Sequence, residues 1–187
     1  MRNKLWPLLL AALLAACAGA HENYYRLDAT AAASTGRSGS GLSVAIGPVG
    51  LPGYLDRAEI VFATGPNEFQ IPSNALWLGS LRENISRAVA ADLGQILGSR
   101  NVRSSFEPGS TPRYRVALDI AHFHGISGQE AILYLRWKIQ DGASGALLSQ
   151  ESASFKESIN GDGYGPLVAA ESRLLAQAAS AIARTLR

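Results

Sequence analysis

Two stretches in the second half of the chain alternate between apolar and polar residues. The apolar positions are Tyr114, Val116, Leu118 and Ile120 in the first stretch, and Leu133, Leu135, Trp137 and Ile139 in the second. This period of two predicts antiparallel strands over residues 114–122 and 131–139, with one face in a core and the other in water. Turn residues at 141–145 lead into a more polar stretch, 147–157, which we expect to be a third strand at the edge of the sheet.

Two longer stretches repeat their apolar residues every three or four positions, as an amphipathic helix does. The first has Leu78, Leu81, Ile85, Val89, Leu93 and Ile96, and the second has Leu167, Leu174, Leu175, Ala178, Ile182 and Leu186. We expect the first helix to follow Asn74 as its N-cap and to end at Gly98, which can adopt the left-handed conformation. Pro166 is expected at the first residue of the second helix.

The first half of the chain carries shorter elements. We expect strands at 24–27, 42–47 and 102–106, a hairpin over 60–71, and an Ala/Ser/Gly-rich loop over 29–41. Runs of strands combined with two helices predict an α+β fold. Its sheet would be mixed but largely antiparallel, with both long amphipathic helices on one face.

The N-terminus has the layout of a secretory signal. Arg2 and Lys4 precede an apolar run over 5–14, and the run ends in Leu14-Ala15-Ala16-Cys17. These four residues resemble the bacterial lipobox, after which the only cysteine becomes the lipid-modified first residue. The alternative is an ordinary signal peptide with a cysteine near its cleavage site by chance. We expect a signal peptide at 1–16, a lipidated tether at 17–21 and a single domain at 22–187.

Removal of the signal changes the charge of the chain. The full sequence has 17 basic and 15 acidic residues, for a formal charge of +2, but Arg2 and Lys4 leave with the signal. The mature protein is therefore formally neutral and has no run of Lys or Arg, which argues against nucleic acid as a partner. No apolar run after residue 16 reaches the ~18 residues that a membrane span needs.

The sequence offers little material for catalysis. His122 and His124 would point to the same side of a strand, as a metal half-site requires, but two polar residues at a strand end are the simpler interpretation. The glycine-rich segment 161–165 precedes a helix, as phosphate-binding loops do, yet it lacks the Lys-Ser/Thr that follows them. Trp77 and Trp137 are expected in the core. We predict no catalytic, cofactor-binding or metal-ligating residues, no cofactor and no enzyme activity. The expected covalent modification is the lipid on Cys17.

The loop at 51–57 leaves two alternatives open. It combines apolar and charged residues between two strands: Leu51, Pro52, Tyr54, Leu55, Asp56 and Arg57. This composition is typical of protein interfaces, so these residues are a candidate partner interface. The same loop could instead fold back on its own sheet, with Asp56 and Arg57 as a solvated pair.

Several motifs together resemble one family, the PqiC-type ABC-transport auxiliary lipoproteins. The matching residues, in order after the lipobox, are Tyr25-Arg26-Leu27, Val44-x-Ile46-Gly47-Pro48-Val49-x-Leu51-Pro52-x-Tyr54-Leu55-Asp56-Arg57, Glu59-Ile60-Val61, Asn67, Trp77-x-x-x-Leu81, Ala90-x-Asp92-Leu93 and Gly163-Tyr164-x-x-Leu167-Val168-Ala169-Ala170. The resemblance covers nearly the whole mature chain. Many relatives have a basic residue just after Ile60-Val61, where this chain has Phe62.

The resemblance implies an outer-membrane lipoprotein that faces the periplasm. Lipoproteins that are retained in the inner membrane carry Asp at the position after the lipid-modified cysteine. This chain has Ala18 there, which agrees with the outer membrane. Such a protein would be a non-catalytic docking subunit of an MCE-type ABC system for intermembrane lipid transport, and its partner would be the periplasmic MCE tunnel protein. The polar edge strand and a position at a tunnel mouth favour a homo-oligomeric ring. The alternative is a structural or assembly lipoprotein that binds an outer-membrane protein or the cell wall.

Overall fold

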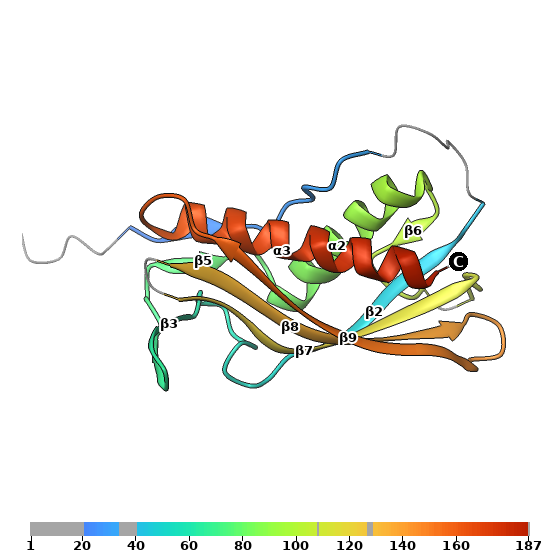
Figure 1. Ribbon diagram of the computed structural model, residues 1–187, viewed down its shortest axis with the longest axis horizontal. Coiled ribbons are helices and arrows are strands. Elements are labelled where there is room, and N and C mark those ends of the chain that lie inside the picture. The colour runs from blue at the N-terminus through green and yellow to red at the C-terminus, as the bar shows by residue number, and fades with distance from the viewer. Residues whose placement is uncertain (1–20, 34–40, 108, 127–128, 187) are drawn as a thin grey trace, which may run out of the picture.

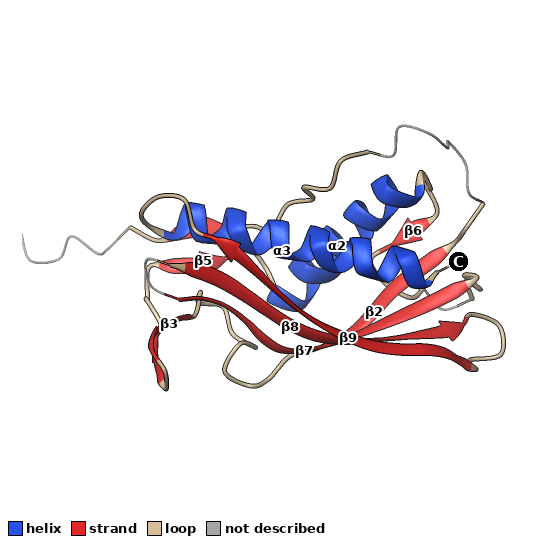
Figure 2. Ribbon diagram, in the orientation of Figure 1, coloured by secondary structure: helices blue, strands red, loops and turns tan. Residues whose placement is uncertain are grey.

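The computed structural model describes residues 21–33, 41–107, 109–126 and 129–186 of the chain. It is an elongated α+β domain in which a twisted sheet carries both helices on one face (Figures 1 and 2). The expected fold class is therefore confirmed. We call the helix-covered face of the sheet the inner face and the opposite one the outer face.

The elements form one large sheet and one small one. In chain order they are β1 (Asn23–Tyr25), β2 (Val44–Gly50), β3 (Phe62–Gly65), β4 (Glu68–Gln70), β5 (Ala75–Trp77), α2 (Leu81–Leu97), β6 (Val102–Arg103), β7 (Tyr114–Ile126), β8 (Glu130–Asp141), β9 (Leu147–Ser158) and α3 (Tyr164–Thr185). β1 and β5 pair in parallel as the small sheet, and the other seven strands form the large one.

The strands β7, β8 and β9 form the antiparallel meander that the alternating pattern predicts. Leu118 of β7 lies opposite Trp137 of β8, which in turn lies opposite Glu151 of β9. The apolar residues of β7 and β8 that face inward are buried, and Trp77 and Trp137 are in the core as expected. In the described part of the chain β9 pairs with β8 alone, so its place at the edge is confirmed.

The other edge of β7 is shared by two separate strands. β2 runs parallel to β7 and pairs with it from Tyr114 to Asp119, whereas β3 pairs in parallel with Gly125 and Ile126. β7 also has a register irregularity after Ile120, between these two ladders. The loop that joins β2 to β3 therefore leaves the sheet beside an open part of the β7 edge.

The helix α2 begins later than the apolar pattern predicts. Asn74 is not its N-cap, because residues 75–77 form β5 and the Asn74 carbonyl accepts a hydrogen bond from the Asn23 amide at 2.8 Å. Ser80 takes the N-cap position, and Leu78 lies outside the helix with 57% of its surface exposed. Pairing with β1 thus overrides the helical pattern here. The predicted end is confirmed: Gly98 is left-handed, with φ of 60°.

Two prolines lie deeper in their elements than expected. β2 continues through Pro48 to Gly50, because a register shift between Ile46 and Val49 removes the need for an amide donor at the proline. α3 begins at Tyr164, two residues before Pro166. That proline is still in the first turn, where no intrahelical amide bond is required.

The segment after β1 bridges the two helices. The amides of Thr30 and Ala31 both donate to Asp92 Oδ1 of α2 at 2.7 Å, and the Asp28 amide donates to Ser172 Oγ of α3 at 3.2 Å. Burial raises the pKa of the Asp92 carboxyl, while the two amide donors act in the opposite direction. The start of the predicted loop over 29–41 is thus hydrogen-bonded to α2. Residues 34–40 of that loop lie outside the described residues.

The predicted signal peptide and Cys17 also lie outside the described residues, so the lipid anchor stays a prediction. Among the helices of the described ranges, we find none with the length and apolar character needed to cross a membrane.

Candidate interface

The loop at 51–57 folds around a tight turn. The Pro52 carbonyl accepts hydrogen bonds from the amides of Leu55 at 2.9 Å and of Asp56 at 3.3 Å. Successive side chains of such a turn point in different directions. Leu55 enters the core and is only 2% exposed, whereas Tyr54 is half-buried against β7. The expectation that Leu55 is an exposed interface residue is therefore wrong.

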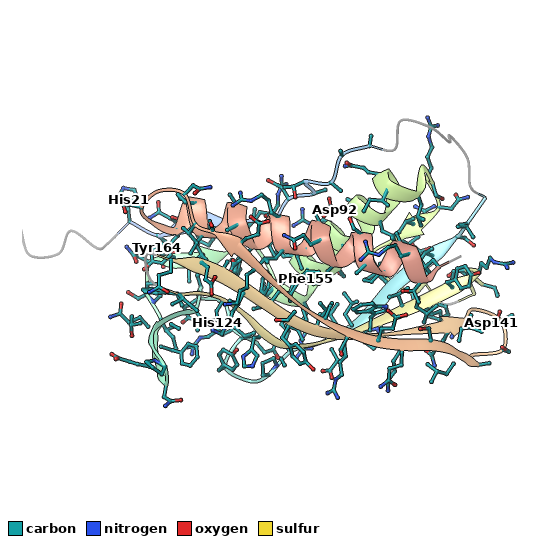
Figure 3. All side chains as sticks on the ribbon, in the orientation of Figure 1. His21, Asp92, His124, Asp141, Phe155 and Tyr164 are labelled. Atoms are coloured by element: carbon teal, nitrogen blue, oxygen red, sulfur yellow. The ribbon has the colours of Figure 1, made fainter. Side chains whose placement is uncertain are left out.

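The Tyr54 side chain covers the open part of the β7 edge. Its hydroxyl donates to the Ala121 carbonyl at 3.4 Å and lies 3.3 Å from His124 Nδ1. The Phe69 ring of β4 lies 5.3 Å from the Tyr54 ring and 5.2 Å from the His124 ring. Figure 3 shows His124 on the side of the sheet away from α3. The cluster is therefore part of the outer face.

The cluster continues across the outer face onto β8. The rings of His122 and His124 are 5.9 Å apart, and the rings of His122 and Tyr134 are 6.4 Å apart. Phe69 and Tyr134 are 42% and 38% exposed, so their rings offer apolar area to solvent. We name these five residues, Tyr54, Phe69, His122, His124 and Tyr134, the aromatic surface. Tyr and Phe are among the side chains that are enriched at protein interfaces.

Burial controls the charge of the aromatic surface. It lowers the pKa of His124 to about 4, with a smaller contribution from the nearby His122 charge. Burial also raises the pKa of the Tyr54 hydroxyl. At neutral pH the buried imidazole and the phenol that covers it are therefore both uncharged.

We predict that the domain loses stability as the pH falls below about 6.5. The unfolded chain takes up a proton at His124 that the folded chain excludes, so unfolding becomes easier between pH 6.5 and pH 4. The difference amounts to about 2 kcal/mol at pH 5. Urea unfolding of wild type and His124→Gln at pH 7 and pH 5 measures it, with His122→Gln as the control that keeps the buried imidazole. An equal pH dependence in wild type and His124→Gln would contradict the assignment.

The charged residues of the loop do not pair with each other. Asp56 accepts two hydrogen bonds from Arg82 of α2, from Nε at 3.0 Å and from Nη2 at 2.8 Å. The same guanidinium donates to the Val49 carbonyl of β2. Arg57 pairs instead with Glu59 at 2.9 Å. The Arg82 bonds lower the pKa of the Asp56 carboxyl and tie the loop to the helix layer.

The sequence offered two possible ligand sites, the His122 and His124 pair and the glycine-rich segment 161–165. The His122 and His124 rings meet edge to face within the aromatic surface, and the described ranges contain no group of three His, Cys, Asp or Glu placed to hold a metal. The glycine-rich segment 161–165 lies at a cavity of about 340 Å³ beside Phe62 and Leu167. It leads into α3, whose N-cap is Gly163.

The structure is thus an α+β domain whose helix-free face carries a partly exposed cluster of aromatic side chains. A family model for the ABC-type transport auxiliary lipoprotein component matches residues 25–183, and the chain belongs to this family. The resemblance seen in its motifs is thereby confirmed. None of the curated proteins compared with the chain matches it.

Solved structures share the fold. The chain is 22% identical to an uncharacterised protein with a TM-score of 0.74, and the likeness covers 90% of this chain and 100% of the other. A Xanthomonas campestris protein from a family of unknown function is 13% identical, with a TM-score of 0.69 and coverage of 86% and 92%. At these identities the likeness supports the fold alone.

Proposed function

We propose that this auxiliary lipoprotein is anchored by a lipid on Cys17 to the periplasmic face of the outer membrane. There it serves as a non-catalytic docking subunit of an MCE-type ABC system for intermembrane lipid transport. The observation that carries the proposal is the family match over residues 25–183, which begins shortly after a lipobox at residues 14–17. Two or more acyl chains suffice for stable attachment to a bilayer.

The aromatic surface supports a docking role. It lies on the face of the sheet that the helices leave free, and its members are uncharged or solvent-facing rings from three strands and one loop. Tyr54 is held by the contacts of its hydroxyl and by the Phe69 ring, so a partner would meet a preorganised surface. Preorganisation reduces the entropy that binding costs.

The anchor is tested by metabolic labelling with a fatty-acid probe. We expect label on the wild-type protein and none on Cys17→Ser, because no other cysteine is present to take its place. The Cys17→Ser protein should also leave the membrane fraction. Label that persists in this variant would refute the lipoprotein assignment.

The docking role is tested by co-purification. Affinity capture of the detergent-solubilised lipoprotein should recover the MCE protein of its system. Recovery of an outer-membrane barrel protein or of peptidoglycan in its place would support the structural or assembly role. Because β9 leaves a backbone edge of 12 residues that begins with exposed Leu147 and Leu148, we also propose a homo-oligomeric ring. Light scattering of the mature protein in detergent would show a strict monomer if that part is wrong.

A further inference from the structure

The small sheet carries apolar side chains on both of its faces. Ala75 and Trp77 of β5 are buried in the core. Leu76, which lies between them, is half-buried, and Leu78, which follows them, is 57% exposed. The Leu78 amide donates to the Tyr25 carbonyl at 2.7 Å, which continues the ladder past the end of β5. Since successive residues of a strand point to opposite faces, Leu76 and Leu78 belong to the face that turns away from the core.

The neighbouring strand β1 adds an aromatic ring to that outward face. Tyr24 is in register with Leu76 across the parallel ladder and is 57% exposed. Partners in register point to the same face, so Tyr24, Leu76 and Leu78 lie together. We name these three residues the apolar patch. Single exposed apolar side chains are common on protein surfaces, whereas adjacent ones mark sites of contact with a partner or a membrane.

The charged groups around the apolar patch are acidic or paired. Glu22 accepts a hydrogen bond from the Tyr24 hydroxyl at 2.6 Å. Glu59 bridges to Leu76 on the edge of β5 away from β1, and its carboxylate pairs with Arg57 at 2.9 Å. This rim does not favour anionic headgroups. Any affinity of this face for a bilayer must therefore come from the apolar side chains.

The apolar patch lies close to the expected lipid anchor. Cys17 precedes Tyr24 by seven residues, which span at most about 25 Å. Of the large apolar side chains that are exposed in the described ranges, Tyr24 is the nearest in sequence to Cys17. Figure 3 shows His21, the first described residue, at the opposite end of the long axis from Asp141. An anchor at Cys17 therefore keeps the patch within reach of the membrane surface.

We propose that the apolar patch is a second membrane contact, in which Tyr24 and Leu78 enter the headgroup region of the bilayer that holds the lipid. Tyrosine is enriched at the membrane–water interface because its ring is apolar while its hydroxyl can stay hydrated. The inference rests on the lipid anchor of the proposed function. The covalent lipid supplies the attachment, and the patch determines which face of the domain meets the bilayer.

The experiment places a fluorescent reporter on the mature lipidated protein in vesicles of phosphatidylcholine and phosphatidylethanolamine. Cys17 is the only natural cysteine and its thiol would carry the lipid, so Leu78→Cys supplies a single thiol for labelling with NBD. Leu147→Cys is the matched control, because Leu147 is also 57% exposed and begins β9 beside the Asp141 turn. We expect NBD at position 78 to shift to shorter emission wavelengths and to lose most of its emission to nitroxide-labelled lipid. NBD at position 147 should stay in water and keep its emission.

A second substitution tests the chemistry of the contact. Tyr24→Ser, added to the labelled Leu78→Cys protein, should reduce the quenching at position 78, because the neighbouring ring no longer enters the bilayer. Tyr134→Ser is the control, since Tyr134 is an exposed tyrosine of the outer face and should leave the quenching unchanged. High salt should also leave the quenching unchanged, because the contact is apolar.

Several results would overturn the proposal. Equal quenching at positions 78 and 147 would show that the domain lies on the bilayer without a specific contact. A reporter at position 78 that stays in water on vesicles, and shifts only when the MCE protein is added, would assign the patch to the partner. Both results are obtained from protein that remains attached to the vesicles, so they reject the patch and leave the lipid anchor standing. Failure of the anchor would instead appear as protein lost from the vesicles.

Discussion

The substitution Tyr54→Ala is expected to reduce binding to the partner at least tenfold, or about 1.4 kcal/mol, with little change in melting temperature. Tyr54 lies on the surface of the outer face and is held by its hydroxyl and by the Phe69 ring, so its loss removes contact area without opening the core. Its few rotatable bonds make it a low-cost anchor. Captured MCE protein per lipoprotein, together with a thermal melt, provides the measurement.

The matched control is the next residue, Leu55→Ala. It should cost about 2–5 kcal/mol of stability, because Leu55 is 2% exposed and its truncation leaves a cavity. Comparison of Tyr54→Ala with Leu55→Ala therefore separates loss of a partner contact from loss of stability. If Tyr54→Ala instead unfolds the domain while binding per folded molecule stays constant, the loop is purely structural and the aromatic surface loses its proposed role.

The substitution Gly142→Ala is expected to destabilise the domain by at least about 3 kcal/mol. A Cβ at this position would lie 1.5 Å from the Pro112 carbonyl oxygen and 2.6 Å from its carbon, and backbone cannot yield as a side chain can. The Gly142 amide also donates to the Arg113 carbonyl at 2.9 Å. To make room for a Cβ, the segment before β7 would have to move away from the end of β8, and this hydrogen bond would be lost. Urea unfolding measures the loss.

Gly165→Ala is the control for that change. Gly165 lies in the first turn of α3 with nothing within 4 Å of an added Cβ, so alanine should be neutral or stabilise the helix by up to about 1 kcal/mol. A Gly142→Ala protein as stable as wild type would mean that the ends of β7 and β8 are not held in this close contact.

The alternating and helical patterns predict the meander and both helices because these depend on local periodicity. The strands that join β7 from the other side are different. Nothing in residues 44–50 or 62–65 specifies that both pair in parallel with one strand, since pairing depends on how the intervening loop closes. Asn74 illustrates the same limit: a good N-cap residue is used in a strand connection because β1 is nearby.

The candidate site was predictable in part. The turn residues Pro52 and Gly53 indicate an irregular loop, and the two-residue spacing of His122 and His124 places them on one face. The contact that joins loop and strand links positions 70 apart in the chain, and the Arg82 pair links positions 26 apart. Neither Phe69 nor Arg82 carried a signal of its own. The direction of Leu55 follows from the turn geometry and not from its apolar character.

The bridge from residues 28–31 to both helices has a mechanical consequence. If the N-terminus is held at a membrane, tension on the tether enters the domain at Asn23 and first loads the short β1–β5 ladder. It then reaches the bonds from the amides of residues 28–31 to Asp92 and Ser172, which pass the load into α2 and α3. The meander that carries the outer face receives the load after the helices, through the packed core and through the bonds of Arg173 and Gln177 of α3 to Glu157 of β9. Tension on the anchor therefore meets the helix layer before it reaches the aromatic surface.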